Sequence, residues 1–286
     1  MSARSLPSPC CVAVDWSGAV HGERRKLWLA VARDGRVERL EGGTRTRAEV
    51  VAHVIELARV ERRLVVGLDF AFSFPAWFAE ARACTDARAL WALAAREGER
   101  WLAECPHPFW GRPGRRKPAL PAHHRATEGA APPVQGITPK SVFQIGGAGA
   151  VGTGSVRGMP HLLELARAGF ALWPFDPPRF PLALEIYPRE LTGPVRKARS
   201  VARRAWLANH ADGEEPALVR RAASSEDAFD AFASALVMSR HAREFEALEP
   251  AHDARELLEG RIWRPLHDPF ERGARTRARR EVERAP

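Results

Sequence analysis

Short apolar runs alternate with helical patterns along the first quarter of the chain. Residues 10–15 (CCVAVD) are apolar up to a final acid, which predicts a buried strand. Residues 26–32 and 36–40 are predicted to form a hairpin, because Asp34-Gly35 between them is a typical turn pair. Residues 46–62 repeat apolar positions at helical spacing, and residues 64–69 (LVVGLD) form a second apolar run ending in an acid. This order predicts that the first strand lies centrally in a mixed α/β sheet, with an antiparallel meander on one side and a parallel strand on the other.

The middle of the chain has a different composition. Residues 75–83 and 86–104 are rich in Ala, Trp and Leu and predict two helices. A basic stretch with many prolines and glycines covers residues 106–136, and a helix is predicted near residues 157–168. The glycine-rich residues 146–154 could wrap a phosphate with their backbone amides, but they lack the GK[ST] ending of a P-loop, so a flexible surface loop is the favoured prediction. We therefore expect residues 70–181 to form a large helical and loop insertion between core strands.

The last third of the chain returns to a strand and amphipathic helices. Residues 182–188 (LALEIYP) predict another buried strand, which the final proline stops. Helices are expected at residues 189–209 and at 224–243, where two serines offer a helix cap. A short helix at 253–259 and a last strand at 262–265 complete the pattern. We expect a single domain over residues 1–270 and a disordered basic tail over 271–286.

Five acids stand where these elements bring side chains together. Asp15, Asp69 and Glu185 lie at or near the carboxyl ends of predicted strands, where open α/β sheets gather functional groups. Asp227 and Asp230 are three positions apart on a predicted helix and therefore share a face, although helix rotation decides which of them binds a ligand. Clustered carboxylates repel one another, and oxygen ligands favour hard cations. The pattern predicts that all five acids are catalytic and hold Mg²⁺ or Mn²⁺.

Positive charge is concentrated in two internal stretches and in the tail 271–286. The formal net charge is +9, and residues 109–127 and 195–204 each contain five Arg or Lys and no acid. Such stretches suit a nucleic acid, whose counterions are released on binding, although a coding bias toward Arg explains the charge equally well. The candidate substrate-binding residues are the basic loop and polar residues near the acids: Ser17, Trp110, Arg112, Arg115, Arg116, Lys117, His124, Arg125 and Lys140.

Cysteine usage and the amino terminus bear on the compartment. The four cysteines form no CxxC pair and no spaced framework, which is typical of a reduced, cytoplasmic protein. A zinc site from Cys105, His107, His123 and His124 is disfavoured, because the spacing fits no standard finger. The first residues are neither a secretory signal nor a membrane span, so we expect no membrane partner. The oligomeric state is left open.

Several of these segments together resemble a known family. They are VAVDWSGA (12–19), VVGLDFAFSFP (65–75), PKSVFQIGG (139–147), LEIYPREL (184–191) and SEDAFDAFASAL (225–236). They are similar to an uncharacterised family of bacterial and archaeal proteins predicted to be nucleases with an RNase H-like fold, over most of residues 10–265. The last helix also resembles the one that supplies the final acids in Holliday-junction resolvases. The resemblance implies an RNase H-like core with a metal site.

One departure from RNase H proper affects the expected metal shell. That enzyme carries an acid on its first helix, where this chain offers Glu49 and Glu56 in uncertain positions. Glu185 is the alternative for that role. The leading hypothesis is therefore a metal-dependent nuclease. The alternatives are a nucleotide-dependent phosphotransferase of the actin/sugar-kinase-like fold, whose phosphate-binding turn residues 15–18 loosely resemble, and a non-catalytic nucleic-acid-binding protein.

Overall fold

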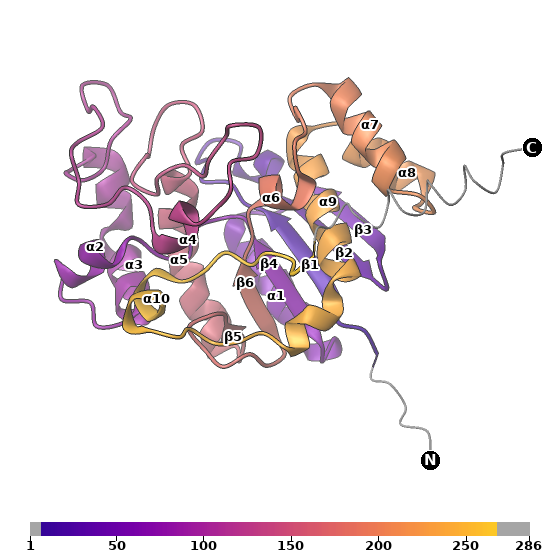
Figure 1. Cartoon of the computed structure of the whole chain (residues 1–286), viewed down its shortest axis with the longest axis horizontal. Helices are drawn as coiled ribbons and strands as arrows, with labels where there is room; N and C mark the ends of the chain where they lie inside the picture. Colours follow the sequence, from indigo (N-terminus) through magenta and orange to yellow (C-terminus); the bar gives the residue numbers. More distant parts are fainter. Residues whose placement is uncertain (1–6, 268–286) are drawn as a thin grey trace, which may run out of the picture.

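The described part of the chain, residues 7–267 of the computed structural model, is built on a mixed six-stranded sheet (Figure 1). The strand order is β3-β2-β1-β4-β6-β5. β1, β2 and β3 pair antiparallel, whereas β4, β6 and β5 continue from β1 in parallel. The strands are β1 (Cys10–Asp15), β2 (Trp28–Arg33), β3 (Arg36–Gly42), β4 (Leu64–Leu68), β5 (Ala171–Leu172) and β6 (Leu182–Glu185). The predicted mixed α/β sheet with a central first strand is confirmed.

The central strands contribute alternate side chains to two separate cores. In β1, Val12 and Val14 belong to one core cluster, whereas Cys11 and Ala13 belong to the other. This is the two-residue period of a strand buried on both faces. Helices α1 (Arg47–Val60), α3 (Ala87–Glu104) and α5 (Gly152–Arg167) contribute to the first cluster, and α9 (Glu226–Arg240) contributes to the second. The sheet is thus the middle layer of three.

Gly67 explains how closely α9 approaches the sheet. It lies in β4, and a Cβ atom there would lie 2.7 Å from the Met238 sulfur and 2.8 Å from Ile186 Cγ2. Only a residue without a side chain permits this packing. The glycine in the run LVVGLD therefore sets the distance between the sheet and the helix that carries Asp227 and Asp230.

The segment between β4 and β6 adds an aromatic group, here called the aromatic core, to the first core cluster. It contains α2 (Ala76–Glu80), α3, α4 (Ala126–Gly129), α5 and the short edge strand β5. The rings of Phe74 and Phe78 lie 4.5 Å apart, and Phe74 stacks on Phe143 at 5.3 Å. Trp101 and Phe109 complete this group at 5.5 Å from one another. Because β5 belongs to the main sheet, the inserted part ends before residue 171 and not at 181.

Three sequence predictions about elements were wrong. The helix expected at 189–209 is divided into α6 (Pro188–Thr192) and α7 (Ser200–His210), because Gly193 has a φ of 69° and Pro194 follows it. The glycine-rich stretch is not entirely a loop, since α5 begins at Gly152. The expected strand at 262–265 is a single bridge between Glu185 and Ile262.

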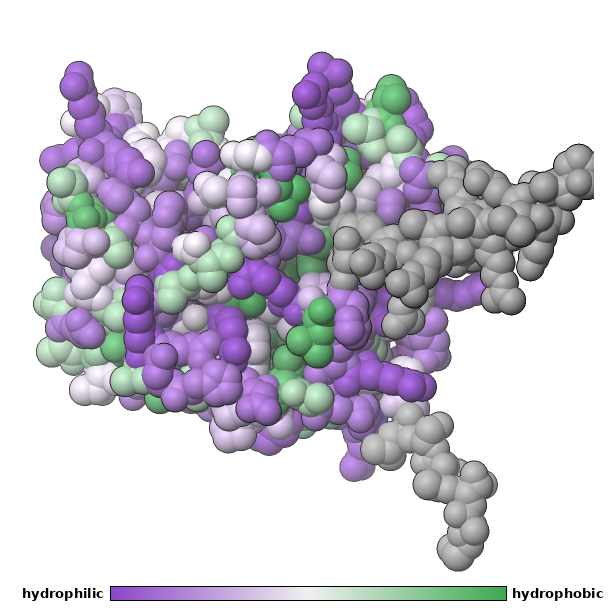
Figure 2. Space-filling view, in the orientation of Figure 1, coloured by the Kyte–Doolittle hydropathy of each residue, from purple (hydrophilic) through white to green (hydrophobic). Residues whose placement is uncertain are grey.

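The remaining elements are short. They are the 3₁₀ helices Glu23–Lys26 and Ala242–Glu246, α8 (Pro216–Ala222) and α10 (Ala254–Glu259). Hydrophilic residues cover most of the face shown in Figure 2, with apolar residues in small groups. No helix within residues 7–267 has the length and hydropathy needed to cross a membrane. The tail predicted at 271–286 lies outside the described residues.

Candidate functional site

Two aspartates lie side by side at the carboxyl ends of neighbouring parallel strands. Asp15 ends β1, and Asp69 directly follows β4. The Asp69 backbone N–H donates to the Val14 carbonyl at 3.1 Å, which continues the parallel ladder. Both residues keep a small part of their surface exposed, while their carboxyl groups are largely removed from water. The sheet therefore places two carboxylates at one edge, as the sequence pattern predicts.

Helix α9 brings two further acids to this edge. Ser225 caps the helix by accepting from the Ala228 N–H at 3.0 Å, and the helix packs on β1 and β2. Asp230 faces inward and is 7% exposed. Asp227, one turn earlier, keeps 30% of its side chain exposed and lies 3.7 Å from the Lys26 ammonium. Asp230 thus belongs to the buried part of the acid cluster, and Asp227 lies at its rim.

The electrostatics of this acid cluster favour protonation. Burial, followed by the negative charges of Asp230, Asp69 and Asp227, raises the pKa of Asp15 well above its usual range. Burial and the Asp230 carboxylate raise the pKa of Asp69 to about 8. Burial also raises the pKa of Asp230, against the opposing effect of Lys197. The cluster therefore holds more negative charge than its environment stabilises, and an added cation would relieve it.

Lys197 is the residue that the sequence analysis missed. It lies in the loop between α6 and α7, and its ammonium forms an ion pair with Asp230 Oδ2. Burial opposes its positive charge, but the carboxylates of Asp230, Asp69 and Asp15 together outweigh that effect and raise the pKa of Lys197. Arg203 fixes the loop by donating to the carbonyls of Lys197 and Ala223. A signal was present: Lys26, Lys117, Lys140 and Lys197 are the four lysines in a chain with 44 basic residues.

The donor set can be tested against a divalent cation. The cluster offers carboxylate oxygens, the ligands that Mg²⁺ and Mn²⁺ prefer. Asp230 Oδ1 is buried and has no hydrogen-bond partner within residues 7–267. In the same residues, however, no three His, Cys, Asp or Glu side chains are grouped so that they hold a metal ion as they stand. The chemistry of the donors therefore fits a hard cation, while Lys197 supplies positive charge at Asp230 in the present arrangement.

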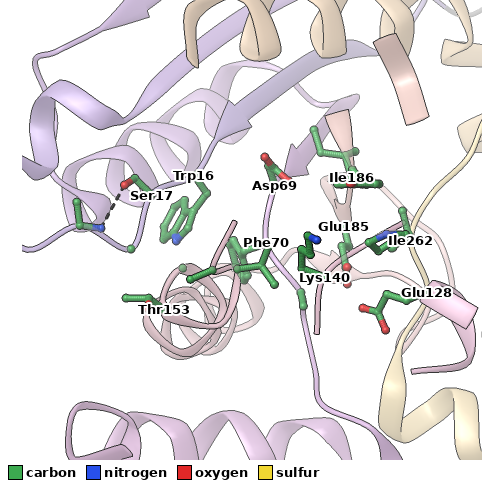
Figure 3. A pocket seen from close by; sticks show the side chains of 18 residues that line it. Trp16, Ser17, Asp69, Phe70, Glu128, Lys140, Thr153, Glu185, Ile186 and Ile262 are labelled. Carbon is green, nitrogen blue, oxygen red and sulfur yellow. Dashed lines mark hydrogen bonds between the residues drawn. The ribbon is translucent and has the colours of Figure 1, made fainter. Parts of the chain in front are cut away.

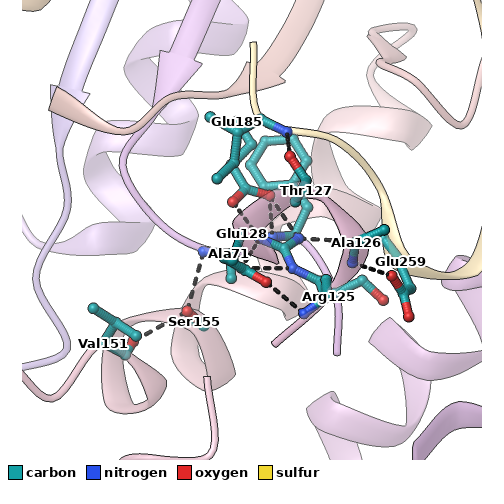
Figure 4. Close-up of polar contacts among 12 residues, drawn as sticks. Ala71, Arg125, Ala126, Thr127, Glu128, Val151, Ser155, Glu185 and Glu259 are labelled. Atoms are coloured by element: carbon teal, nitrogen blue, oxygen red, sulfur yellow. Dashed lines mark hydrogen bonds and ion pairs between the residues drawn. The ribbon is translucent and has the colours of Figure 1, made fainter. Parts of the chain in front are cut away.

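Glu185 differs from the aspartates because its carboxylate is already occupied (Figure 4). Arg125 donates to both of its oxygens, at 2.8 and 2.5 Å, and the Phe72 N–H donates at 2.9 Å. The same guanidinium binds the Glu128 carboxylate, at 2.8 Å from Nε, and the Glu259 carbonyl at 3.0 Å. Burial raises the pKa of Glu185, although Arg125 opposes this. Glu185 is thus part of a buried ion-pair network rather than a free ligand.

The role expected for Arg125 is wrong. Its side chain is 0% exposed, so it cannot reach a nucleic-acid backbone. It begins α4 and joins the inserted segment to the end of β6 and to the residues after α10. The basic run in the sequence gave no sign that one of its arginines is internal.

A cavity of about 420 Å³ adjoins Asp69 (Figure 3). Asp69 and Glu185 line one part of it, and Trp16 and Ser17 line another together with the first turn of α5. Lys140, one of the predicted substrate-binding residues, also lines this space. The indole N–H of Trp16 is buried and has no hydrogen-bond acceptor among the described residues. The cavity thus brings a lysine and a tryptophan together with two carboxylate residues.

The other candidate substrate residues lie in the basic loop. Trp110 is half-buried against the aromatic core, and the Lys117 ammonium lies 5.9 Å from its ring centroid. His124 is half-buried, and burial together with Lys117 and Lys140 lowers its pKa, which disfavours the charged form. Three arginines of the loop are exposed: Arg112, Arg115 and Arg116.

The first helix supplies no acid to the cluster. Glu49 closes the capping box of α1 with Thr46 and pairs with Arg24 at 2.6 Å. Glu56 is exposed and pairs with Arg59 at 2.6 Å. Both carboxylates are thus engaged on the surface of α1.

Comparisons with protein-family models, curated proteins and solved structures find no match to this chain.

Proposed function

We propose that the protein is a divalent-metal-dependent nuclease with an RNase H-like core. The observation that carries this proposal is the convergence of Asp15, Asp69 and Asp230 from β1, β4 and α9. The antiparallel meander followed by parallel strands supports the RNase H-like assignment, because it places β1 and β4 at the centre with their carboxyl ends adjacent. The fold by itself does not imply the activity, which rests on the acid cluster.

In this proposal Asp15, Asp69 and Asp230 hold Mg²⁺ or Mn²⁺, and Asp227 binds from the rim. Bound metal activates water and stabilises the leaving oxygen of a phosphodiester. Lys197 holds Asp230 in position and neutralises part of the cluster before the cation binds. Glu185 and Arg125 fix the end of β6 beside the cavity and are not ligands. The cavity beside Asp69 receives the nucleotide next to the cleaved bond.

The test is cleavage of labelled single-stranded, duplex and branched DNA and RNA in Mn²⁺. Wild type is compared with Asp15→Asn and Asp69→Asn, which keep the size of each side chain and remove its charge. Asp34→Asn is the matched control, because Asp34 is exposed in the β2–β3 turn and has a φ of 51°, which Asn tolerates. We expect at least a hundredfold loss of rate in the two cluster variants and none in the control.

Binding of Mn²⁺, measured by calorimetry on the same proteins, separates two kinds of failure. If the folded wild type binds Mn²⁺ but cleaves none of the substrates, the nuclease activity is refuted and the metal site stands. An Asp69→Asn variant that cleaves as fast as the wild type would show that the reaction takes place at another site.

A second candidate function, nucleotide-dependent phosphotransfer, is favoured by one observation. The turn at Ser17 and Gly18 packs directly on the start of α5, where a Cβ on Gly18 would lie 2.5 Å from the Gly154 nitrogen. The turn and the helix N-terminus together line the cavity of about 420 Å³, a volume in the range of small-ligand sites. Helix N-termini attract phosphate. Under this alternative, a non-hydrolysable ATP analogue raises the melting temperature beyond the effect of Mg²⁺; under the nuclease proposal it does not.

A further inference from the structure

A second and larger hollow lies beside α7. It has a volume of about 1180 Å³ and is lined by residues of the segment 192–210 and by Gln135 of the inserted segment. We call this hollow the α7 groove. Its lining combines two arginines, Arg196 and Arg199, with an apolar wall that includes Val195 and Val201.

The basic run 195–204 is divided between the interior and this groove. Lys197 and Arg203 face inward, where they pair with Asp230 and with backbone carbonyls. Arg196 and Arg199 are exposed, and neither makes an ion pair within residues 7–267. Unpaired guanidinium groups in a hollow attract anions, because their planar fork binds phosphate or carboxylate through two parallel hydrogen bonds.

The apolar wall narrows the choice of occupant. Val201 is 69% exposed, and Ala205 lies in the same groove. Apolar and charged residues lie side by side over the α7 end of the molecule in Figure 2. An occupant must therefore present both negative charge and apolar faces. Single-stranded nucleic acid does so, whereas a duplex buries its base faces and a peptide of acidic residues alone has no apolar faces.

The groove is connected to the acid cluster through one loop. Arg196 lines the groove, and its chain neighbour Lys197 pairs with Asp230. We propose that the α7 groove binds the single-stranded nucleic acid that flanks the bond held at the acid cluster. This inference rests on the proposed nuclease function, since it assigns the path of that enzyme's substrate.

The test measures binding separately from cleavage. Fluorescence anisotropy of labelled dodecathymidylate is recorded in EDTA at several salt concentrations, with wild type and the double variant Arg196→Gln, Arg199→Gln. The control is the double variant Arg62→Gln, Arg167→Gln. These two arginines are also exposed, and they precede the amino ends of β4 and β5, whereas the acid cluster lies at the carboxyl ends of the strands. We expect roughly a tenfold weaker affinity and a salt slope smaller by about 1.4 in the groove variant, since each lost phosphate contact contributes about 0.7. The control should match wild type.

Several outcomes would overturn the proposal. Equal affinity and slope in the groove variant and the control would remove the groove as a binding surface. Tighter binding of a duplex of the same length, or equal competition by polyglutamate, would reassign the groove to another class of partner.

Hydrolysis of bis(p-nitrophenyl) phosphate in Mn²⁺ keeps this result apart from the nuclease proposal, because that substrate is too short to occupy the groove. Retained hydrolysis by the groove variant, together with its weaker DNA binding, supports both proposals. If the wild type does not hydrolyse this substrate but its DNA binding still depends on Arg196 and Arg199, the groove proposal stands and the nuclease proposal is refuted.

Discussion

Asp69→Asn should stabilise the metal-free protein at alkaline pH. The pKa of Asp69 rises from an ordinary 3.8 to about 8 in the folded chain, mainly through burial and then through Asp230. Between these values the folded state binds more protons than the unfolded state, so the free energy of unfolding falls as the pH rises from about 4 to about 8. Asparagine carries no charge and removes this cost.

The magnitude follows from the two pKa values. They differ by about 4 pH units, and each unit corresponds to about 1.4 kcal/mol, which gives a ceiling of about 6 kcal/mol at pH 8.5. Only part of this is recovered, because Asp15 and Asp230 remain beside the replaced side chain and share the repulsion. We therefore expect Asp69→Asn to raise the free energy of unfolding by about 2 kcal/mol at pH 8.5 and by less than about 1 kcal/mol at pH 5.

Urea denaturation followed by circular dichroism in EDTA, at pH 5, 6.5 and 8.5, measures this difference. A gain of about 2 kcal/mol corresponds to a melting temperature about 4 to 8 °C higher in a chain of this size. Asp34→Asn controls for the loss of a carboxylate at an exposed position. A variant that is less stable than wild type at pH 8.5, or whose advantage is the same at all three pH values, would refute the account of a carboxylate held at a cost until metal binds.

Two further predictions concern the framework of the site. Replacing Arg125 by Met should lower the free energy of unfolding by about 3 to 5 kcal/mol, because the buried carboxylates of Glu185 and Glu128 lose their partner. Urea denaturation measures this loss, and a value below about 1 kcal/mol would show that the network is not needed for stability. Gly18→Ala should cost about 1 to 3 kcal/mol, because its Cβ would lie 2.5 Å from the backbone of Thr153 and Gly154. Gly129→Ala is the control for thermal unfolding, since a Cβ there meets nothing within 4 Å, and equal effects of the two changes would contradict the close packing of the turn on α5.

The strands that carry Asp15 and Asp69 could be predicted because their sequences leave few alternatives. An apolar run of five or six residues with turn residues on both sides fits a strand buried on both faces, and its last residue then lies at the sheet edge. The same reasoning placed Asp230 on an apolar helix, but the orientation of that helix needed its packing on β1 and β2. Sequence periodicity therefore located the acids along the chain and left the choice between Asp227 and Asp230 to the tertiary structure.

Charged residues were harder to place, because the sequence does not show which of them lose contact with water. Arg125 follows two histidines in a polar loop and resembles the exposed Arg115 and Arg116 in every local respect, yet it is completely buried. Its burial depends on Glu185, 60 positions away, and on the Glu259 carbonyl, 134 positions away. Internal ion pairs of this kind are specified by distant partners. Burial therefore separates the structural basic residues from the exposed ones. Arg125 and Lys197 pair with buried acids, whereas Arg196 and Arg199 are exposed and form no ion pair within residues 7–267, so only the latter two can be tested as binding residues without breaking an internal ion pair.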